Sequence, residues 1–306
     1  MIMTTAYPIG MPGSPWQEAE KKQWQEAQEI KRSYQQEVES KILALADEFD
    51  VEQYGALSYG ENEYKLYAIK SRDFSDSRPT ILVTGGVHGY ETSGVHGAID
   101  FVKTQGKNYQ THFNIVVLPC ISPWGYETIN RWNPNAIDPN RSFYADSPAA
   151  ESKQAMAYIA QFDDLLCHVD LHETTDTDNS EFRPALAARD GVSHDNWNIP
   201  DGFYLVGHTQ KPQHSFQTAI IKEVEKVTHI APADENGRLI GVPIEQLGVI
   251  NYDGTKLGLC MGMTDAEYVT TTEVYPDSPT ANDEICVQGQ VASVVGALNY
   301  IKSIEE

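Results

Sequence analysis

The chain has 306 residues, and its 44 Asp and Glu residues outnumber 22 Lys and Arg residues, which gives a formal net charge of -22. So acidic a surface repels phosphate backbones and anionic lipid headgroups, and we therefore expect neither nucleic acid nor a membrane among the partners. A hydrophobic content of 41% excludes a disordered or fibrous chain and is typical of a globular protein.

Targeting and redox signals favour a cytoplasmic protein. The N-terminal sequence lacks the basic segment and apolar segment of a secretory signal, and no apolar run reaches the roughly 18 residues that a spanning helix needs. The cysteines are scattered without a CxxC pair, beside or within apolar segments, which is typical of buried, reduced thiols. They are Cys120, Cys167, Cys260 and Cys286.

The N-terminal part of the chain, about residues 1–50, is predicted to be a helical extension. Residues 1–14 are rich in Gly and Pro and are expected to be irregular. Good helix formers follow, which predicts a surface helix from Ser14 or the next residue, broken once before Ala46. Alternating apolar residues around a Gly-Glu-Asn turn in 54–72 then predict a hairpin at a sheet edge.

Further along the chain, short apolar runs alternate with segments of helical periodicity. The predicted strands are 80–86, 113–121, 164–173, 202–208 and 266–276, and the predicted helices are 94–104, 147–162, 217–230 and 286–304. Strands that alternate with helices predict an α/β fold with a mixed, mostly parallel central sheet and helices on both faces. We expect residues 1–306 to form a single domain of this class.

Reactive side chains follow three of the predicted strands. His88 and Glu91 come after the first buried strand, His172 stands near the end of the third, and Glu273 near the end of the last. Because open α/β sheets bind ligands outside the carboxyl ends of their strands, we expect these residues to share one site.

The pair His88 and Glu91 suits a metal ion. Residues three apart lie on one face of a turn, and an imidazole nitrogen with a carboxylate oxygen is a donor set that Zn²⁺ accepts. An HxxE pair alone is a weak signal, since a surface histidine followed by a helix-start glutamate is common.

His172 strengthens the metal hypothesis. It ends an apolar run, and several charged or polar residues follow it closely. Burying so many polar side chains at the end of a core strand is costly unless the charges are paired or bind a metal. His168 and Asp170 lie on the same strand face, so either could be the ligand instead, and a core histidine is the structural alternative. We prefer His172 because it lies nearest the carboxyl end. Two histidines and a carboxylate leave a fourth zinc position open, as in catalytic sites.

These motifs resemble the zinc carboxypeptidase family, which includes carboxypeptidases A and B, and its acylase branch of aspartoacylases and succinylglutamate desuccinylases. The resemblance runs from about residue 80 to 276. It rests on the HxxE pair, on His172 in DLHET, on the box Asp138-Pro139-Asn140-Arg141, and on a Thr-rich strand that ends in Glu273.

The resemblance implies a role for each matching residue. One Zn²⁺ per chain would be held by His88, Glu91 and His172. Glu273 would be the general base on a zinc-bound water, and Arg131 would polarise the scissile carbonyl. Asn140 and Arg141 would grip the substrate's terminal carboxylate, and Tyr252, in a mobile loop at 250–259, would cap the substrate. The structural alternatives are surface ion pairs for the arginines, a solvated strand end for Glu273 and an edge-strand aromatic for Tyr252.

The function implied is a zinc metallopeptidase, a carboxypeptidase that removes C-terminal residues from small peptides. An N-acyl amino-acid deacylase is the alternative hydrolase, with an acylated amino acid as substrate, and a catalytically silent binding protein is the alternative outside enzymes. A nucleophile mechanism is not expected, because the sequence has no GxSxG motif. His194, His208 and His214 lack a compact ligand spacing and are expected to be loop or surface residues.

Overall fold

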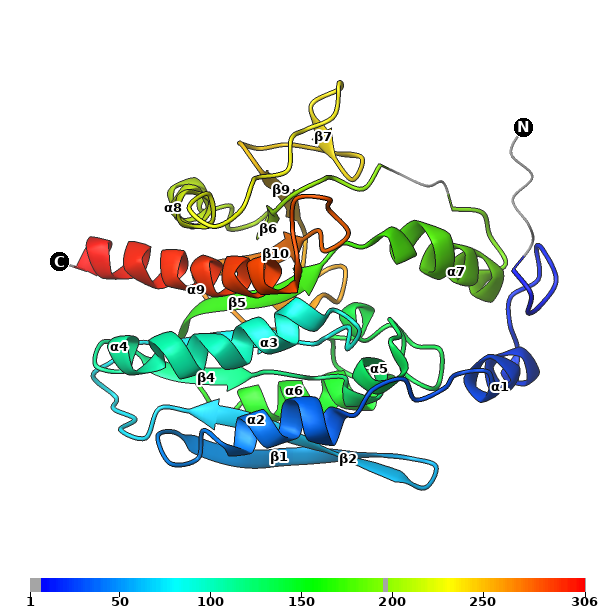
Figure 1. Ribbon diagram of the computed structural model, residues 1–306, viewed down its shortest axis with the longest axis horizontal. Coiled ribbons are helices and arrows are strands. Elements are labelled where there is room, and N and C mark those ends of the chain that lie inside the picture. The colour runs from blue at the N-terminus through cyan, green and yellow to red at the C-terminus, as the bar shows by residue number, and fades with distance from the viewer. Residues whose placement is uncertain (1–6, 195–197, 306) are drawn as a thin grey trace.

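The structure, a computed structural model, describes residues 7–194 and 198–305 and is built around one eight-stranded sheet (Figure 1). The strand order is β1-β2-β4-β3-β5-β10-β6-β9, and β7 and β8 pair separately. The strands are β1 Asp50–Tyr59, β2 Asn62–Lys70, β3 Thr80–Gly85, β4 Asn114–Leu118, β5 Leu165–Glu173, β6 Tyr204–His208, β7 Arg238–Leu239, β8 Val242–Pro243, β9 Val249–Tyr252 and β10 Tyr268–Val274.

Pairing within the sheet is mixed, as predicted. Strand β3 runs parallel to β4 and β5, β5 runs parallel to β10, and β6 runs parallel to β9. The antiparallel pairs are β1 with β2, β2 with β4, and β10 with β6. The edge hairpin predicted at 54–72 is confirmed, because β1 lies at one edge and pairs only with β2 among the described strands.

Helices cover both faces of the sheet, which confirms the predicted fold class. The helices are α1 Glu18–Glu26, α2 Ser40–Leu43, α3 Thr92–Phe101, α4 Lys107–Tyr109, α5 Pro123–Thr128, α6 Ala150–Ile159, α7 Arg183–Asp190, α8 His214–Val224 and α9 Asp283–Glu305. Short π-helical turns at 35–39, 102–106 and 178–182 and 3-10 turns at 139–141 and 260–262 complete the elements. No helix in the described ranges is both long and apolar enough to cross a membrane.

Alternate residues of the central strands face opposite layers. On β3, Ile81 and Val83 pack with the layer that contains α3, α8 and α9, whereas Leu82 packs with α6. Helices α3 and α9 run side by side over one face (Figure 1). Both sides of β3 are therefore buried, which explains its continuous apolar sequence.

Two parts of the chain differ from the prediction or extend it. The segment expected to be a mobile loop at 250–259 begins as strand, because residues through Tyr252 belong to β9 and pair with β6. That strand is too short to show a clear periodicity in the sequence. The N-terminal helix breaks as expected, between α1 and the turn at 35–39, while residues 1–6 of the expected irregular arm lie outside the described residues.

The N-terminal segment packs through its tryptophans. Trp24 contacts the rings of Trp124 and Trp132, and Trp16 meets Trp132 edge-on with ring centroids 6.2 Å apart. Backbone N–H of Trp16 also donates to the Arg189 carbonyl in α7 at 2.8 Å. These contacts hold α1 close to α7 on one side of the molecule (Figure 1).

Glycines shape the chain where β3 ends. Gly86 has a φ of +57°, a left-handed conformation that other residues adopt at a cost. At Gly89 any Cβ would overlap the Ser122 carbonyl oxygen and the Tyr126 nitrogen, so only glycine allows this loop to lie against α5. The close approach fixes the backbone on either side of His88.

Replacing Gly89 by Ala should lower the free energy of unfolding by about 1–3 kcal/mol, because the added methyl group overlaps backbone atoms that cannot move independently. Chemical denaturation followed by circular dichroism measures the change. Gly289→Ala is the matched control. This glycine lies inside α9, where an added methyl group meets Thr228 and Phe203 at 3.6 and 3.7 Å, so the change should stabilise by about 0.5–1 kcal/mol. Equal stabilities of the two variants would contradict the described packing of the loop.

Candidate metal centre

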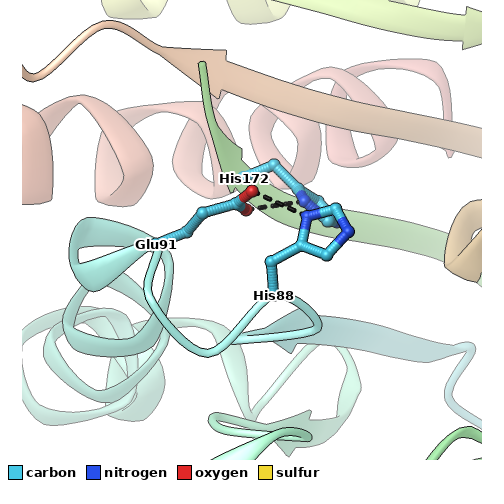
Figure 2. Close-up of side chains that lie close together, drawn as sticks. All are labelled: His88, Glu91 and His172. Atoms are coloured by element: carbon cyan, nitrogen blue, oxygen red, sulfur yellow. Dashed lines mark hydrogen bonds and ion pairs between the residues drawn. The ribbon is translucent and has the colours of Figure 1, made fainter. Parts of the chain in front are cut away.

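Three side chains from separate segments meet at the carboxyl ends of β3 and β5. His88 lies in the loop after β3, Glu91 caps the start of α3, and His172 stands near the end of β5. Figure 2 shows the Glu91 carboxylate facing both imidazole rings, with a dashed line to each. Its oxygens lie 2.7 Å from Nδ1 of His88 and 2.7 Å from Nδ1 of His172. The sequence prediction that these three residues share one site therefore agrees with their placement.

Each imidazole is backed by a second carboxylate. Nε2 of His88 lies 2.9 Å from Oδ1 of Asp138, and Nε2 of His172 lies 2.9 Å from Oδ2 of Asp170. A carboxylate that accepts from Nε2 leaves Nδ1 free to bind a metal, which is how histidine ligands are commonly oriented. Both Nδ1 atoms face Glu91, so the ligand nitrogens converge.

The donor set fits a divalent cation. One ligand atom from each of the three residues lies within 4.8 Å of the others, and all three side chains are buried. Two nitrogens and a carboxylate suit Zn²⁺ and leave a position for water or substrate. A carboxylate this deeply buried is costly without compensating positive charge, which a cation supplies.

The pKa values of these groups show how strongly the charges interact. Burial raises the pKa of Glu91, but the facing His172 and His88 outweigh it and hold the pKa well below its ordinary value. Burial likewise lowers the pKa of His172, yet Asp170 and Glu91 outweigh it and raise the pKa well above its ordinary value. The Glu91 carboxylate and the facing His172 imidazole therefore stabilise each other's charged forms.

Glu273 lies beside this cluster on the next strand. In the parallel pairing of β10 with β5 its Cα partner is His172, so both side chains leave the same face of the sheet. Thr174 donates its hydroxyl to Oε2 of Glu273 at 2.8 Å, and the hydroxyls of Thr174 and Tyr204 lie 2.7 Å apart. Burial raises the pKa of Glu273 to about 8, although His172 acts in the other direction.

The cluster opens into a cleft of about 850 Å³. All of the site residues predicted from the sequence line it, namely His88, Glu91, Arg131, Asn140, Arg141, His172, Tyr252 and Glu273. Lys21 of α1, Arg189 of α7 and Trp16, just before α1, also line the cleft. The cleft therefore joins the candidate ligands, the candidate base and the candidate carboxylate-binding residues in one space.

The two predicted arginines differ in their surroundings. Arg131 donates through Nε to Asp138 at 3.1 Å and through Nη1 to Asp178 at 3.2 Å. Arg141 has an exposed side chain that donates to the Asn140 carbonyl, and no carboxylate of the described residues lies within ion-pair distance of it. Arg141 is thus a cleft cation that is available to a negatively charged ligand.

Asn140 and Tyr252 complete the predicted set. Oδ1 of Asn140 accepts from the Cys260 backbone at 2.7 Å, and its Nδ2 lies 3.5 Å from Nε2 of His172. Tyr252 is half-buried at the end of edge strand β9, where the structural alternative for this residue places it. It also lines the cleft.

A protein-family model described as "Protein of unknown function (DUF2817)" matches residues 31–234. The chain belongs to this family. The DUF2817 match includes the three candidate ligands and the arginines of the cleft, but ends before Tyr252 and Glu273. Among curated proteins, no match to this DUF2817 chain was found.

Solved structures with the same fold are metallopeptidase-like proteins. A candidate metallopeptidase from Shewanella amazonensis SB2B has a TM-score of 0.62 at 18% identity and covers 85% of this chain and 91% of its own. A metallo-carboxypeptidase from Pseudomonas aeruginosa, in complex with (2-guanidinoethylmercapto)succinic acid, has a TM-score of 0.57 at 14% identity. The match covers 86% of this chain and 68% of the carboxypeptidase chain. Bovine thrombin-activatable fibrinolysis inhibitor, in complex with tick carboxypeptidase inhibitor, has a TM-score of 0.56 at 12% identity. The match covers 92% of this chain and 99% of the matched chain. The resemblance to carboxypeptidases that the motifs indicated is confirmed for the fold of this DUF2817 protein.

Sequence reasoning missed several groups of the DUF2817 site. Asp138 opens the recognised box but was given no role, and Asp170 was considered only as an alternative ligand. The contact of Asp138 with His88 had no local signal, because the two residues come from different loops. Asp178 and Thr174 were not singled out at all, since a short polar run after a strand does not show which side chains turn inward. In the described part of the chain, His194, His208 and His214 belong to no cluster of possible metal ligands. The expectation that His208 lies in a loop or on the surface is wrong, because it is buried at the end of strand β6.

Purified DUF2817 protein stripped of metal should bind one Zn²⁺ or Co²⁺ per chain at this site. Replacing His88 or His172 by Ala should weaken binding by more than about 100-fold, because the loss of a ligand exceeds the 10- to 100-fold effect of losing a residue that only orients one. Competition with a chromophoric chelator measures the affinity. The control is His112→Ala, because His112 is exposed, lies outside the cleft, and its ring bonds the neighbouring Thr111 hydroxyl. Equal loss in the control, or none in the site variants, would rule out the assigned ligands.

Proposed function

We propose that the protein is a zinc-dependent metallocarboxypeptidase that removes C-terminal residues from small peptides. One observation carries the proposal. The candidate ligands His88, Glu91 and His172, the base Glu273 and an arginine without a carboxylate partner line one cleft. The carboxypeptidase names of structures with the same fold support it.

The metal would be one Zn²⁺ per chain, held by Nδ1 of His88, Nδ1 of His172 and the Glu91 carboxylate. When bound there, it would supply Lewis acidity to a substrate carbonyl and to the attacking water. Asp138 and Asp170 keep the two imidazoles turned toward the ion through their bonds to Nε2.

Glu273 would be the general base. The Thr174 hydroxyl bonds Oε2, which leaves Oε1 to take a proton from the attacking water and pass it to the leaving amine. Tyr204 supports this arrangement, because burial raises its pKa well above the ordinary value and the phenol therefore keeps its proton to donate to Thr174. The carboxylate is held in one orientation before substrate binds.

Substrate would be recognised by its terminal carboxylate. Arg141 offers a guanidinium to it, and such pairs are bidentate and directional. Asn140, whose Oδ1 is held by the Cys260 amide, would offer Nδ2 to the same group. Arg131 would help to stabilise the developing oxyanion, and Tyr252 would close over the bound residue. These four roles and the cleft between them define an exopeptidase, because a peptide is gripped at its free end.

The proposed catalytic unit extends over the whole chain. Strand β10 carries Glu273 and lies inside the sheet, between β5 and β6. The hydrolase domain therefore continues beyond the family match, and the N-terminal extension of about residues 1–50 forms one border of its cleft through Trp16 and Lys21.

Glu273→Gln should lower kcat by about 10²- to 10⁴-fold, because the amide cannot accept the proton. The base works only when ionised, so kcat/KM of the wild type should rise with pH through the pKa of Glu273. Burial sets that pKa at about 8 without metal, and a bound cation lowers it. The variant should lose this rise. Steady-state kinetics across pH measures both effects.

The matched control is Glu267→Gln, since Glu267 is exposed just before β10. It should leave the rate and the pH profile unchanged. Zinc content of the Glu273→Gln protein should equal that of the wild type, because Glu273 is not a ligand. Full activity in Glu273→Gln would remove the residue from the mechanism.

A peptide panel tests the function directly. Short peptides with free C-termini should release their last residue, whereas C-terminally amidated versions should not, because only the former offer a carboxylate to Arg141. A chelator should abolish release and added Zn²⁺ should restore it. Arg141→Ala should raise KM by about 10- to 100-fold, the worth of a charged hydrogen-bonded contact. Mass spectrometry of the products reads out each case.

Other results would redirect the proposal. Release of acetate or succinate from acylated amino acids, with none from peptides, would show an N-acyl amino-acid deacylase. Cleavage of amidated peptides at equal rate would contradict recognition through the terminal carboxylate. Absence of metal binding and of any hydrolysis would leave a catalytically silent binding protein.

A further inference from the structure

A second cluster of polar side chains lies buried behind His172. It consists of Thr84 on β3, His168 and Asp170 on β5, and Cys260 in the 3-10 turn at 260–262, and each side chain is 0% exposed. His168, Asp170 and His172 are two residues apart on β5 and so share one face of the strand. Thr84 pairs with Asp170 across β3 and β5. The proposed mechanism does not use Thr84, His168 or Cys260.

The hydrogen bonds of this cluster have one consistent direction. The Thr84 hydroxyl has a single proton, and it donates that proton to Oδ1 of Asp170 at 2.6 Å. Because that proton is used, the Thr84 hydroxyl oxygen must accept in its two other bonds. The donors are Nε2 of His168 at 2.9 Å and the Cys260 thiol at 3.5 Å. Nδ1 of His168 is then an acceptor, and the Thr264 hydroxyl lies 3.4 Å from it.

The direction of these hydrogen bonds also bears on the candidate metal ligand His172. With Oδ1 of Asp170 bound by Thr84, its Oδ2 faces Nε2 of His172 at 2.9 Å. A carboxylate oxygen only accepts, so this contact requires a proton on Nε2, and a protonated Nε2 cannot bind a metal. Nδ1 of His172, which faces the Glu91 carboxylate at 2.7 Å, is then the ring nitrogen left for a cation. We infer that the buried chain His168–Thr84–Asp170 is a positioning network, which selects Nδ1 of His172 as the metal-binding nitrogen and holds the ring in place.

The same four residues could instead be a second cation site. One atom each of His168, Asp170 and Cys260 lies within 4.8 Å of the others, and nitrogen, oxygen and sulfur are all zinc donors. The Thr84 hydroxyl, however, already bonds all three residues, through Nε2 of His168, Oδ1 of Asp170 and the Cys260 thiol. None of the four side chains is among the buried polar groups of the described residues that lack a partner. The four side chains thus form a closed hydrogen-bond network around the Thr84 hydroxyl.

This inference rests on the proposed metal site, and its test measures metal affinity and histidine tautomer in the full chain. Thr84→Val keeps the shape but removes the donor to Asp170. It should weaken Zn²⁺ binding by about 10- to 100-fold, and Thr84→Ser should restore the affinity. Cys260→Ala, which removes the longest contact, should weaken binding far less than Thr84→Val. Thr80→Val is the matched control, since Thr80 is a buried threonine on the same strand outside the network.

Nitrogen NMR of the zinc-loaded wild type gives a second readout that no variant can confound through misfolding. The expected result is a protonated Nε2 and a metal-bound Nδ1 in His172, and Thr84→Val should broaden or split these signals. A metal-bound Nε2 in the wild type, or unchanged affinity and signals in Thr84→Val, would overturn the network's role.

Two further outcomes separate the hypotheses. Two Co²⁺ ions per chain, with a sulfur-to-cobalt charge-transfer band that Cys260→Ala abolishes, would overturn the network in favour of a second cation site. A wild type that binds no divalent ion at all would sink the proposed metallohydrolase itself, whereas a Thr84→Val protein that binds as tightly as the wild type sinks only this inference.

Discussion

The structure depends on one carboxylate shared by two imidazoles. Glu91 is buried at the start of α3 and meets Nδ1 of both His88 and His172. A charge in that position requires opposite charge close by, because desolvation costs several kcal/mol per ion. The loop after β3, the start of α3 and the end of β5 must therefore come together for the fold to be stable, and this same requirement assembles the site.

The arrangement continues outward as alternating acids and bases. Asp138 contacts His88, and Arg131 contacts both Asp138 and Asp178. On the other side Asp170 contacts His172, and the Thr84 hydroxyl donates to Asp170. Each charged group is thus satisfied by its neighbours. Such a network fixes the orientation of both imidazole rings, which is the usual requirement for a precise metal site.

The sequence allowed the fold class and the candidate ligands to be predicted because their signals are local. An HxxE pair, a strand that ends in DLHET and a Thr-rich strand that ends in Glu273 can each be recognised within about ten residues. The contacts that orient these residues are different in kind. Asp138 reaches His88, and Thr174 reaches Glu273, only after separate strands and loops have packed, so no spacing in the chain indicates them. Strand β9 escaped prediction for the related reason that four residues show no periodicity.

The position of β10 affects how the molecule is made. This strand comes last in the chain among the strands of the sheet, yet it sits between β5 and β6 rather than at an edge. The sheet cannot close around its centre until β10 is available to insert, so its assembly relies on contacts between distant parts of the chain. A ribosome-bound chain that has emerged only as far as β9 contains His88 and His172 but not Glu273. Synthesis itself thus delays the complete cleft until the chain has been made through β10.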